Sequence, residues 1–432
     1  MKRSRKVGVH FREEPRKEII GDVISRVLKD DPLPLYVAFG VFSFWSWLRL
    51  TMFFPDGQPT PADQIESYVQ LVTCALIAFR FLTIKTSPAR RAISLILALF
   101  GVILWIRSRE GWILWSLLFI AAGKDVSIKR IAEITAFSCL SVTLLAVIGS
   151  GSGLIENVVA ARSDNGVVRV ALGFQHPNSL GAALVTAVIA IYIAVNGRMA
   201  RFVAPVLNLA AIYIVMFIAR SKTSALILFM TLVSVILASF IRRVGKSRSH
   251  LYVLLFVSLA MMGLSIFFLY NFDANIALHE WLDGLLSGRL SLAKAYFVRA
   301  PLTLFGNSYS GVMEWNVDGV IKEFVVDNVY DHAIMRFGIV LFTMFVVAFI
   351  ALYAFAIRRA CLVYELTLFA VFIAMGFAEI LALQIHSDFL LFLFSTLIYS
   401  SHPLRKSSES GGTCELGCHS SAMRSRFTVR GE

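Results

Sequence analysis

Long apolar runs separated by short polar connections dominate the chain. An apolar helix needs about 20 residues to cross roughly 30 Å of hydrocarbon, and about twelve runs approach that length. The pattern predicts an all-α fold, a polytopic transmembrane helix bundle of about twelve spans. The expected cores are residues 34–54, 67–84, 92–106, 111–123, 131–149, 179–196, 202–219, 224–241, 251–270, 334–357, 361–381 and 384–400.

Composition and charge support a membrane protein. With 57% hydrophobic and 16% charged residues and a mean hydropathy of +0.73, the chain is unlike a soluble globular protein. The net charge of +13 could indicate nucleic acid, but most Lys and Arg residues lie in segments that are cytoplasmic if the N-terminus is inside. We therefore expect a multi-pass membrane protein with both termini in the cytoplasm, contacting membrane lipids and no nucleic acid.

Polar segments divide the chain into three parts. Residues 1–33 form a basic cytoplasmic tail without the features of a cleaved signal peptide, and residues 401–432 form a polar cytoplasmic tail expected to be disordered. The membrane domain, residues 34–400, contains two long outer loops, 150–178 and 271–333. Connections of this length are uncommon unless they are functional or disordered.

The second outer loop is too rich in aromatic and aliphatic residues to be disordered. Apolar side chains recur within it at roughly helical spacing, which predicts an amphipathic helix on the outer membrane surface. We therefore expect a partly helical extracytoplasmic cap. The residues with this spacing are Leu282, Leu285, Leu286, Leu290 and Phe297.

The stretch "VALGFQHPNSLG" (170–181) begins an apolar run and carries the first candidate site residues. Pro177 suits the first turn of a helix, and His176 before it is a candidate N-cap, with Asn178 beside it. Free N–H groups at such a helix start favour an anion such as a phosphate. The simpler interpretation is a capped helix at the membrane boundary.

Cationic side chains on the outer face are the second group of candidates. Arg169 precedes the helix start, and Arg220 and Lys222 lie in the short outer connection "ARSKTS". Outer cations oppose the positive-inside trend, although each could be a snorkelling side chain. Arginine can hold phosphate oxygens through a bidentate fork, so these residues suit a diphosphate-linked lipid.

The large outer loop supplies the remaining candidates. They are polar groups in "SGRLSLAKAYF" (287–297) and around the start of the tenth run, where a carboxylate also suits a helix N-terminus. Motifs of soluble enzymes, such as a P-loop, GxSxG, HExxH or paired CxxC, are missing from the sequence, and we expect no cofactor. These candidates are Arg289, Asp327, Asn328, Tyr330, Asp331 and His332.

The order of these features resembles the O-antigen ligase and O-antigen polymerase superfamily of bacterial envelope proteins, particularly the polysaccharide repeat-unit polymerases. The pieces that carry the resemblance are "VRVALGFQHPNSLG", "RSKTS", "SGRLSLAKAYF", "LFGNSYSG" and "DNVYDHAIMRFG". The order of apolar runs and polar loops extends the resemblance over about residues 34 to 400.

The resemblance implies a metal-independent glycosyltransferase that uses an undecaprenyl-diphosphate-linked saccharide on the outer face of the bacterial cytoplasmic membrane. Arg169, Arg220 and Arg289 would engage the donor diphosphate, and the remaining polar candidates would contact substrate. A flippase and a chain-length regulator are implied as partners. The sequence departs from the ligase pattern, because Asp327 occupies the place of a histidine and Leu341 that of a small residue or tyrosine.

This departure favours a polymerase of repeat units, with Asp327 orienting or activating the acceptor and His332 as a second candidate base. A ligase that moves finished glycan to another acceptor is the alternative within the superfamily. A lipid-linked oligosaccharide flippase or transporter is the alternative from another class. It would require charged or broken helices near the bilayer midplane, whereas the charged residues of this chain gather at span ends, with Arg80 as the nearest exception.

Overall fold

A computed structural model describes residues 31–55, 61–161, 168–195, 202–286, 288–299, 302–308, 314–317, 320–323 and 326–400. Each expected apolar core contains a helical segment. The helix ends differ by a few residues from the ends of the expected cores, because capping residues and prolines determine where a helix begins and ends. Pro177, for example, is the first residue of α7. The main helices are α2 (Leu33–Leu48), α3 (Ala62–Thr83), α4 (Pro88–Ser108), α5 (Trp112–Ala122), α6 (Ile128–Gly151), α7 (Pro177–Ala194), α8 (Ala204–Phe217), α9 (Lys222–Val244), α10 (Ser247–Asn271), α14 (Gly338–Arg359) and α15 (Val363–Gly376).

Short elements complete the described chain. The 3-10 helix η3 (Ile380–Leu383) lies between α15 and the twelfth core, and that core is broken into the 3-10 helix η4 (Phe389–Phe394) and the helix α16 (Ser395–Tyr399). The helix α13 (Val329–His332) precedes the tenth core, which begins within the π-helical turn η2 (Ala333–Phe337). Two antiparallel hairpins, which sequence analysis did not anticipate, lie in the long loops: β1 (Val159–Ala161) with β2 (Val168–Val170), and β3 (Glu314–Val317) with β4 (Val320–Glu323).

The helices form a multi-pass membrane protein. Within the described residues, seven helices are long and apolar enough to cross a membrane, and five apolar helices are shorter. Large apolar side chains such as Leu82 and Phe256 are exposed on the outside of the bundle, where hydrocarbon would cover them. Cys74 is exposed on α3, whereas Cys139 and Cys361 are buried.

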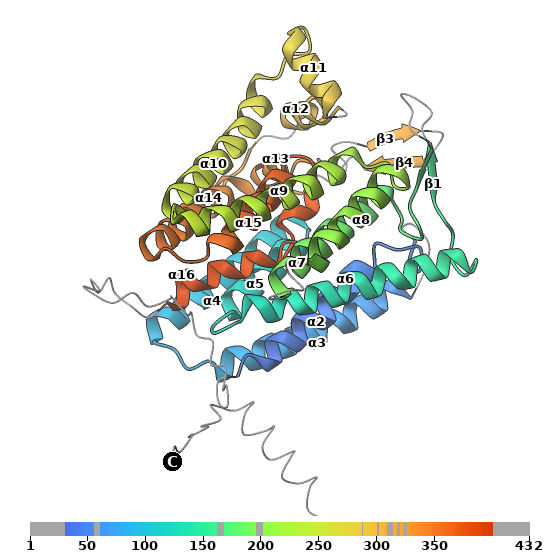
Figure 1. Cartoon of the computed structure of the whole chain (residues 1–432). Coiled ribbons are helices and arrows are strands. Elements are labelled where there is room, and N and C mark those ends of the chain that lie inside the picture. Colours follow the sequence, from blue (N-terminus) through green and yellow to red (C-terminus); the bar gives the residue numbers. More distant parts are fainter. Residues whose placement is uncertain are drawn as a thin grey trace, which may run out of the picture.

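The bundle has a hairpin end, which we define as the end that carries the β1–β2 hairpin and the first residues of α7, α9 and α13 (Figure 1). Backbone hydrogen bonds tie this end together: Val170 N–H donates to Ile218 O at 3.2 Å, and Met52 N–H donates to Gly173 O at 2.8 Å. The inside of the bundle is apolar, and α7 and α15 are almost entirely buried within it.

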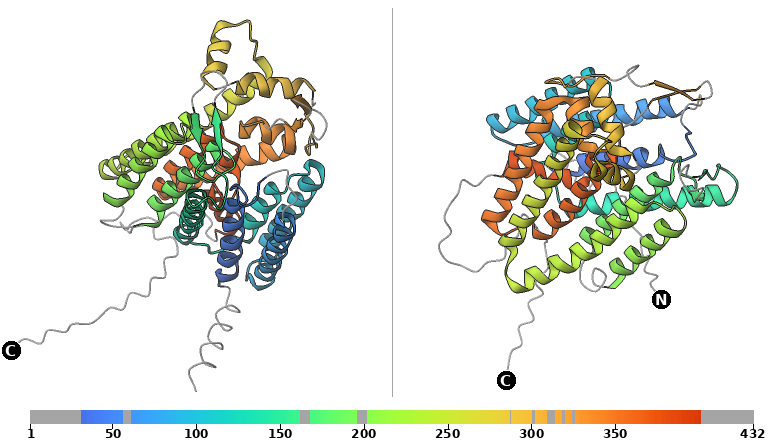
Figure 2. Two further views of the ribbon diagram at one scale, coloured as in Figure 1. Left: turned by 90° about the vertical axis from the view of Figure 1, so that its right-hand side faces the viewer. Right: turned by 90° about the horizontal axis from the view of Figure 1, so that it is seen from above.

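The amphipathic helix expected over 282–297 is two helices. They are α11 (Ala277–Leu285) and α12 (Arg289–Arg299), which stand beyond the end of α10 (Figures 1 and 2). Gly288 lies between them with φ +79°, a left-handed conformation that does not continue a helix. Asp283 Oδ1 then accepts from the backbone N–H groups of Leu290 and Ser291, which satisfies the start of α12.

Candidate functional site

Arg169 on β2 is fixed against the starts of two helices at the hairpin end. Its guanidinium donates to Asn178 Oδ1 on α7, and its Nε donates to Ala219 O at 3.3 Å, just before α9. Ser221 Oγ also donates to Asn178 Oδ1, at 3.3 Å. Gly181 permits this close approach, because a Cβ there would lie 2.3 Å from Ser224 Oγ. Two predicted residues, Arg169 and Asn178, are therefore in direct contact.

His176 is the N-cap of α7, as the sequence predicted. Its Nδ1 accepts from the backbone N–H of Asn178 at 3.1 Å, while the ring remains accessible to solvent. Partial burial, followed by the positive charges of Arg169 and Arg289, lowers the pKa of His176, and Asp327 opposes that shift. The imidazole is thus neutral at pH 7 and lies near all three charged groups.

Arg220 and Lys222 flank Ser221 and are both exposed. Arg220 has φ +47°, a left-handed conformation that is uncommon outside glycine. The backbone of the preceding residue, Ala219, accepts from Arg169. The strained turn thus carries Arg220 next to the Arg169 anchor, and such strain is often retained where function requires it.

Arg289 begins α12 and forms an ion pair with Asp327, which directly precedes α13. The Arg289 Nε to Asp327 Oδ2 distance is 3.0 Å, and the side chains are 11% and 42% exposed, respectively. Arg289 also donates to Leu286 O at 3.3 Å. The pair connects the α11–α12 segment to the bundle and leaves part of the Asp327 carboxylate open to solvent.

Glu379, which was not among the candidates predicted from the sequence, is the second carboxylate near the Arg289–Asp327 pair. It is half-buried in the break after α15. Burial, followed by the negative charge of Asp327, raises the pKa of Glu379 to about 7, although the charge of Arg289 opposes the shift. Glu379 therefore changes its protonation state near neutral pH, as a general base requires.

Packing around Gly376 explains how Glu379 reaches the Arg289–Asp327 pair. A Cβ on Gly376 would lie 2.7 Å from Val329 Cγ1 and 2.9 Å from the Tyr330 hydroxyl, so only glycine allows α15 to end against α13. Phe377 then packs against a small apolar cluster that includes Leu290 of α12. The segment leading to Glu379 is thus held between the start of α12 and the start of α13.

We call these side chains the open cluster: Arg169, His176, Arg220, Arg289, Asp327 and Glu379. Two other predicted site residues, Asn328 and Tyr330, are buried and do not belong to the open cluster. Asn328 is buried and caps α13 by accepting from Tyr330 N–H at 3.0 Å. Tyr330 is fully buried and its hydroxyl donates to Ile373 O, so neither side chain faces the solvent side of the cluster.

His332, the second candidate base, belongs to a separate closed cluster with Glu110 and Arg336. His332 Nε2 lies 2.8 Å from Glu110 Oε2, and Arg336 Nε lies 2.9 Å from Glu110 Oε1. Trp112 Nε1 also donates to this carboxylate, at 2.9 Å. Burial raises the pKa of Glu110, but His332, Arg336 and Trp112 together outweigh burial and lower it below its usual range.

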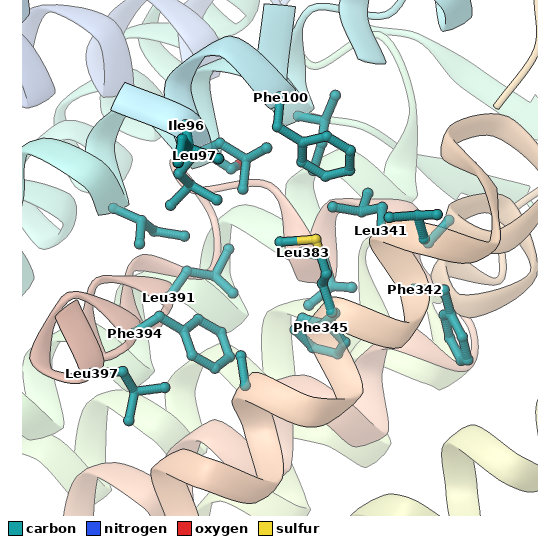
Figure 3. A pocket seen from close by; sticks show the side chains of 18 of the residues that line it. Ile96, Leu97, Phe100, Leu341, Phe342, Phe345, Leu383, Leu391, Phe394 and Leu397 are labelled. Carbon is teal, nitrogen blue, oxygen red and sulfur yellow. The ribbon is translucent and has the colours of Figure 1, made fainter. Parts of the chain in front are cut away.

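An apolar pocket of about 510 Å³ lies between α4, α5, α14 and the η4–α16 segment (Figure 3). Phe100, Leu341, Phe345 and Phe394 point into it. Trp112 also lines the pocket and so joins it to the closed cluster. Its lining is almost entirely apolar, so such a pocket suits hydrocarbon better than a polar group.

The open cluster combines three arginines with two carboxylates, a set able to bind a doubly charged phosphate ester and, through Glu379, to accept a proton. Among the described residues, no group of three or more His, Cys, Asp and Glu side chains is placed to hold a metal ion. No known protein family, curated protein or solved structure matches this chain.

Proposed function

We propose that the protein is a polymerase of lipid-diphosphate-linked oligosaccharide repeat units for a cell-surface polysaccharide. The observation that carries this proposal is the meeting of Arg169 and Arg289 with Asp327 and Glu379 at one end of an apolar bundle, where Arg220 lies in the turn that contacts Arg169. A lipid diphosphate has a hydrocarbon tail and an anionic head, and this end offers arginines for the head.

The proposed step joins the acceptor hydroxyl oxygen to the anomeric carbon of the donor sugar while the bond from that carbon to the diphosphate breaks. The arginines neutralise the charge that develops on the departing diphosphate, which is the largest kind of contribution available to such a site. Asp327, paired with Arg289, orients the acceptor. Glu379 takes the hydroxyl proton, because its pKa of about 7 suits that task.

The proposed topology has twelve crossings, with both termini in the cytoplasm of a bacterium and the hairpin end on the outer face of the cytoplasmic membrane. The seven long and five shorter apolar helices support that number. The hydrocarbon of the carrier would contact the apolar pocket and the exposed apolar faces. A flippase would supply the lipid-linked units, and a chain-length regulator would act beside the polymerase.

Replacing Arg220 tests the proposal. Arg220→Ala should abolish polymer while single lipid-linked units stay detectable, because the exposed side chain contributes charge rather than packing. Arg243→Ala is the matched control, since Arg243 is exposed near the far end of α9. Unchanged polymer length in Arg220→Ala would exclude the proposed role of this arginine.

A ligase that moves finished glycan to another acceptor would use the same cluster. Profiles of surface glycan from a deletion strain separate the two activities. Loss of a polymerase leaves single units attached to their acceptor, whereas loss of a ligase leaves long unattached chains on the carrier.

One observation favours a transporter or flippase, the alternative that the sequence supports less well. The broken segment after α15 contains His386 and Asp388, both buried, so polar groups do not gather only at helix ends. Arg80, the nearest exception to the gathering of charged residues at span ends, donates to the backbone carbonyls of Asp31 and Lys124. Lipid-linked units trapped on the inner leaflet of a deletion strain would favour the transporter.

A further inference from the structure

The segment between α15 and α16 is irregular although it lies in the interior of the bundle. The α-helix ends at Gly376, and two 3-10 helices and a connecting turn replace it as far as Phe394. His386, Ser387 and Asp388 in that turn are 5%, 0% and 0% exposed. Irregular backbone at such depth is tolerated in membrane proteins where it is buried in protein or lines a cavity.

Contacts with neighbouring helices place the turn midway along the bundle. Ser387 Oγ lies 3.0 Å from Thr186 Oγ1, near the middle of α7. The His386 ring packs against Trp47 and Phe42 of α2, with centroid distances of 5.1 and 6.4 Å. Neither residue is therefore part of the open cluster at the hairpin end.

Several polar atoms in this region have no hydrogen-bond partner. Asp388 Oδ1 accepts from Leu390 N–H at 3.1 Å, but Asp388 Oδ2 has no partner, and neither has His386 Nε2. Ser43 Oγ, one helical turn from Trp47 on α2, is also without one. Unpaired polar atoms at this depth are costly, and they commonly mark bound water or an ion.

The groups that face Asp388 do not include a described cation. Tyr330 of α13 lies close enough to interact electrostatically with Asp388, and Cys139 of α6 lies beside Trp47. The partners of the turn on α5 and α7 are the hydroxyl groups of Ser116 and Thr186. A carboxyl group buried without a cation is stable in its neutral, protonated form.

We propose that His386 and Asp388 form a proton-binding site inside the bundle, in which Asp388 carries the proton and water connects it to His386 Nε2 and Ser43. This site is distinct from the glycosyl-transfer site proposed above and does not depend on that function. Buried ionisable groups in broken membrane helices commonly mark proton or ion pathways. The unpartnered Oδ2 atom is the position for the exchangeable hydrogen.

Infrared spectroscopy of the full-length protein in lipid vesicles tests the site. The wild type should show a carbonyl band of a protonated carboxyl group that is lost in Asp388→Asn and that shifts when water is replaced by D2O. Asp331→Asn is the matched control, because Asp331 is equally buried but accepts from Ser265 Oγ at 2.7 Å. This control should keep the Asp388 band. If Asp388→Asn does not fold, Asp388→Glu should move the band instead of removing it.

Three outcomes would overturn the proposal. A spectrum of Asp388→Asn identical to that of the wild type would mean that Asp388 is ionised. A band that does not shift in D2O would mean that the carboxyl group is sealed and structural. A band that disappears when choline chloride is replaced by sodium chloride would assign the site to a sodium ion rather than to a proton.

Discussion

Two clusters of the same residue types lie at the hairpin end, and they differ in how completely their charges are paired. In the closed cluster, both oxygens of Glu110 are occupied by His332, Arg336 and Trp112. In the open cluster, Asp327 is 42% exposed, and Arg220 and His176 face solvent. The segment from 326 to 338 contributes to both clusters.

This difference teaches that arginine, histidine and carboxylate near one another do not by themselves define a site. A carboxylate whose oxygens are all occupied holds helices together, because exchanging its partners for a ligand would leave buried charges unpaired. A carboxylate with accessible oxygens can exchange partners without that penalty. We therefore expect variants of the open cluster to change activity, and variants of the closed cluster to change stability.

The largest expected effect concerns Glu379. Glu379→Gln should lower the rate of glycosyl transfer on the order of 10²-fold or more, which is the usual contribution of a general base. In the wild type, the rate should rise with pH through about 7 as Glu379 loses its proton, and the variant should lack this rising limb. Rates measured between pH 5 and 9 with lipid-linked donor would show it.

Glu365→Gln is the matched control, since Glu365 lies in the first turn of α15, at the opposite end of that helix. Stability gives a second readout. Because folding raises the pKa of Glu379, the stability from protonation is present below its ordinary pKa of 4.5 and lost as pH rises through about 7. An unchanged rising limb in Glu379→Gln would remove Glu379 from the mechanism.

A different effect, on stability rather than on rate, is expected in the closed cluster. Glu110→Ala should lower the free energy of unfolding by about 3 kcal/mol, because it removes the carboxylate that pairs with both His332 and Arg336. Thermal unfolding in detergent would measure the loss. Glu133→Ala should change stability by less than about 1 kcal/mol, since Glu133 forms an exposed pair with Arg130 at 3.1 Å. Equal losses in both variants would contradict the distinction between the clusters.

Much of the fold could be predicted because hydrocarbon burial depends on local hydropathy. Each apolar run contains a helical segment, and the cap at His176 followed from the proline after it. The hairpins and the break at Gly288 were missed, because short strands and left-handed glycines depend on contacts between distant segments. The tails, with Cys414 and Cys418, lie outside the described residues.

The site, like the fold, was predicted only where local sequence carries the signal. Arg169, Asn178, Arg289 and Asp327 were found because they are polar groups in the outer loops or at the starts of apolar runs, and the structure brings them to one end. Glu379 and Asp388 were missed because each lies near or within an expected span, where one acid barely changes the mean hydropathy. The sequences "GFAE" and "HSD" were the available signal, because an acidic residue inside a membrane-spanning run is costly and usually functional.

The smallest expected effect separates two roles of His176. His176→Ala should cost about 1 kcal/mol, because the N–H of Asn178 loses its acceptor. His176→Asn should restore the cap and the unfolding temperature, since asparagine is a strong N-cap. If the exposed imidazole also contacts the donor diphosphate, His176→Asn should still transfer glycan more slowly than the wild type. Full activity in His176→Asn would restrict His176 to capping and leave the arginines as the only diphosphate ligands in the open cluster.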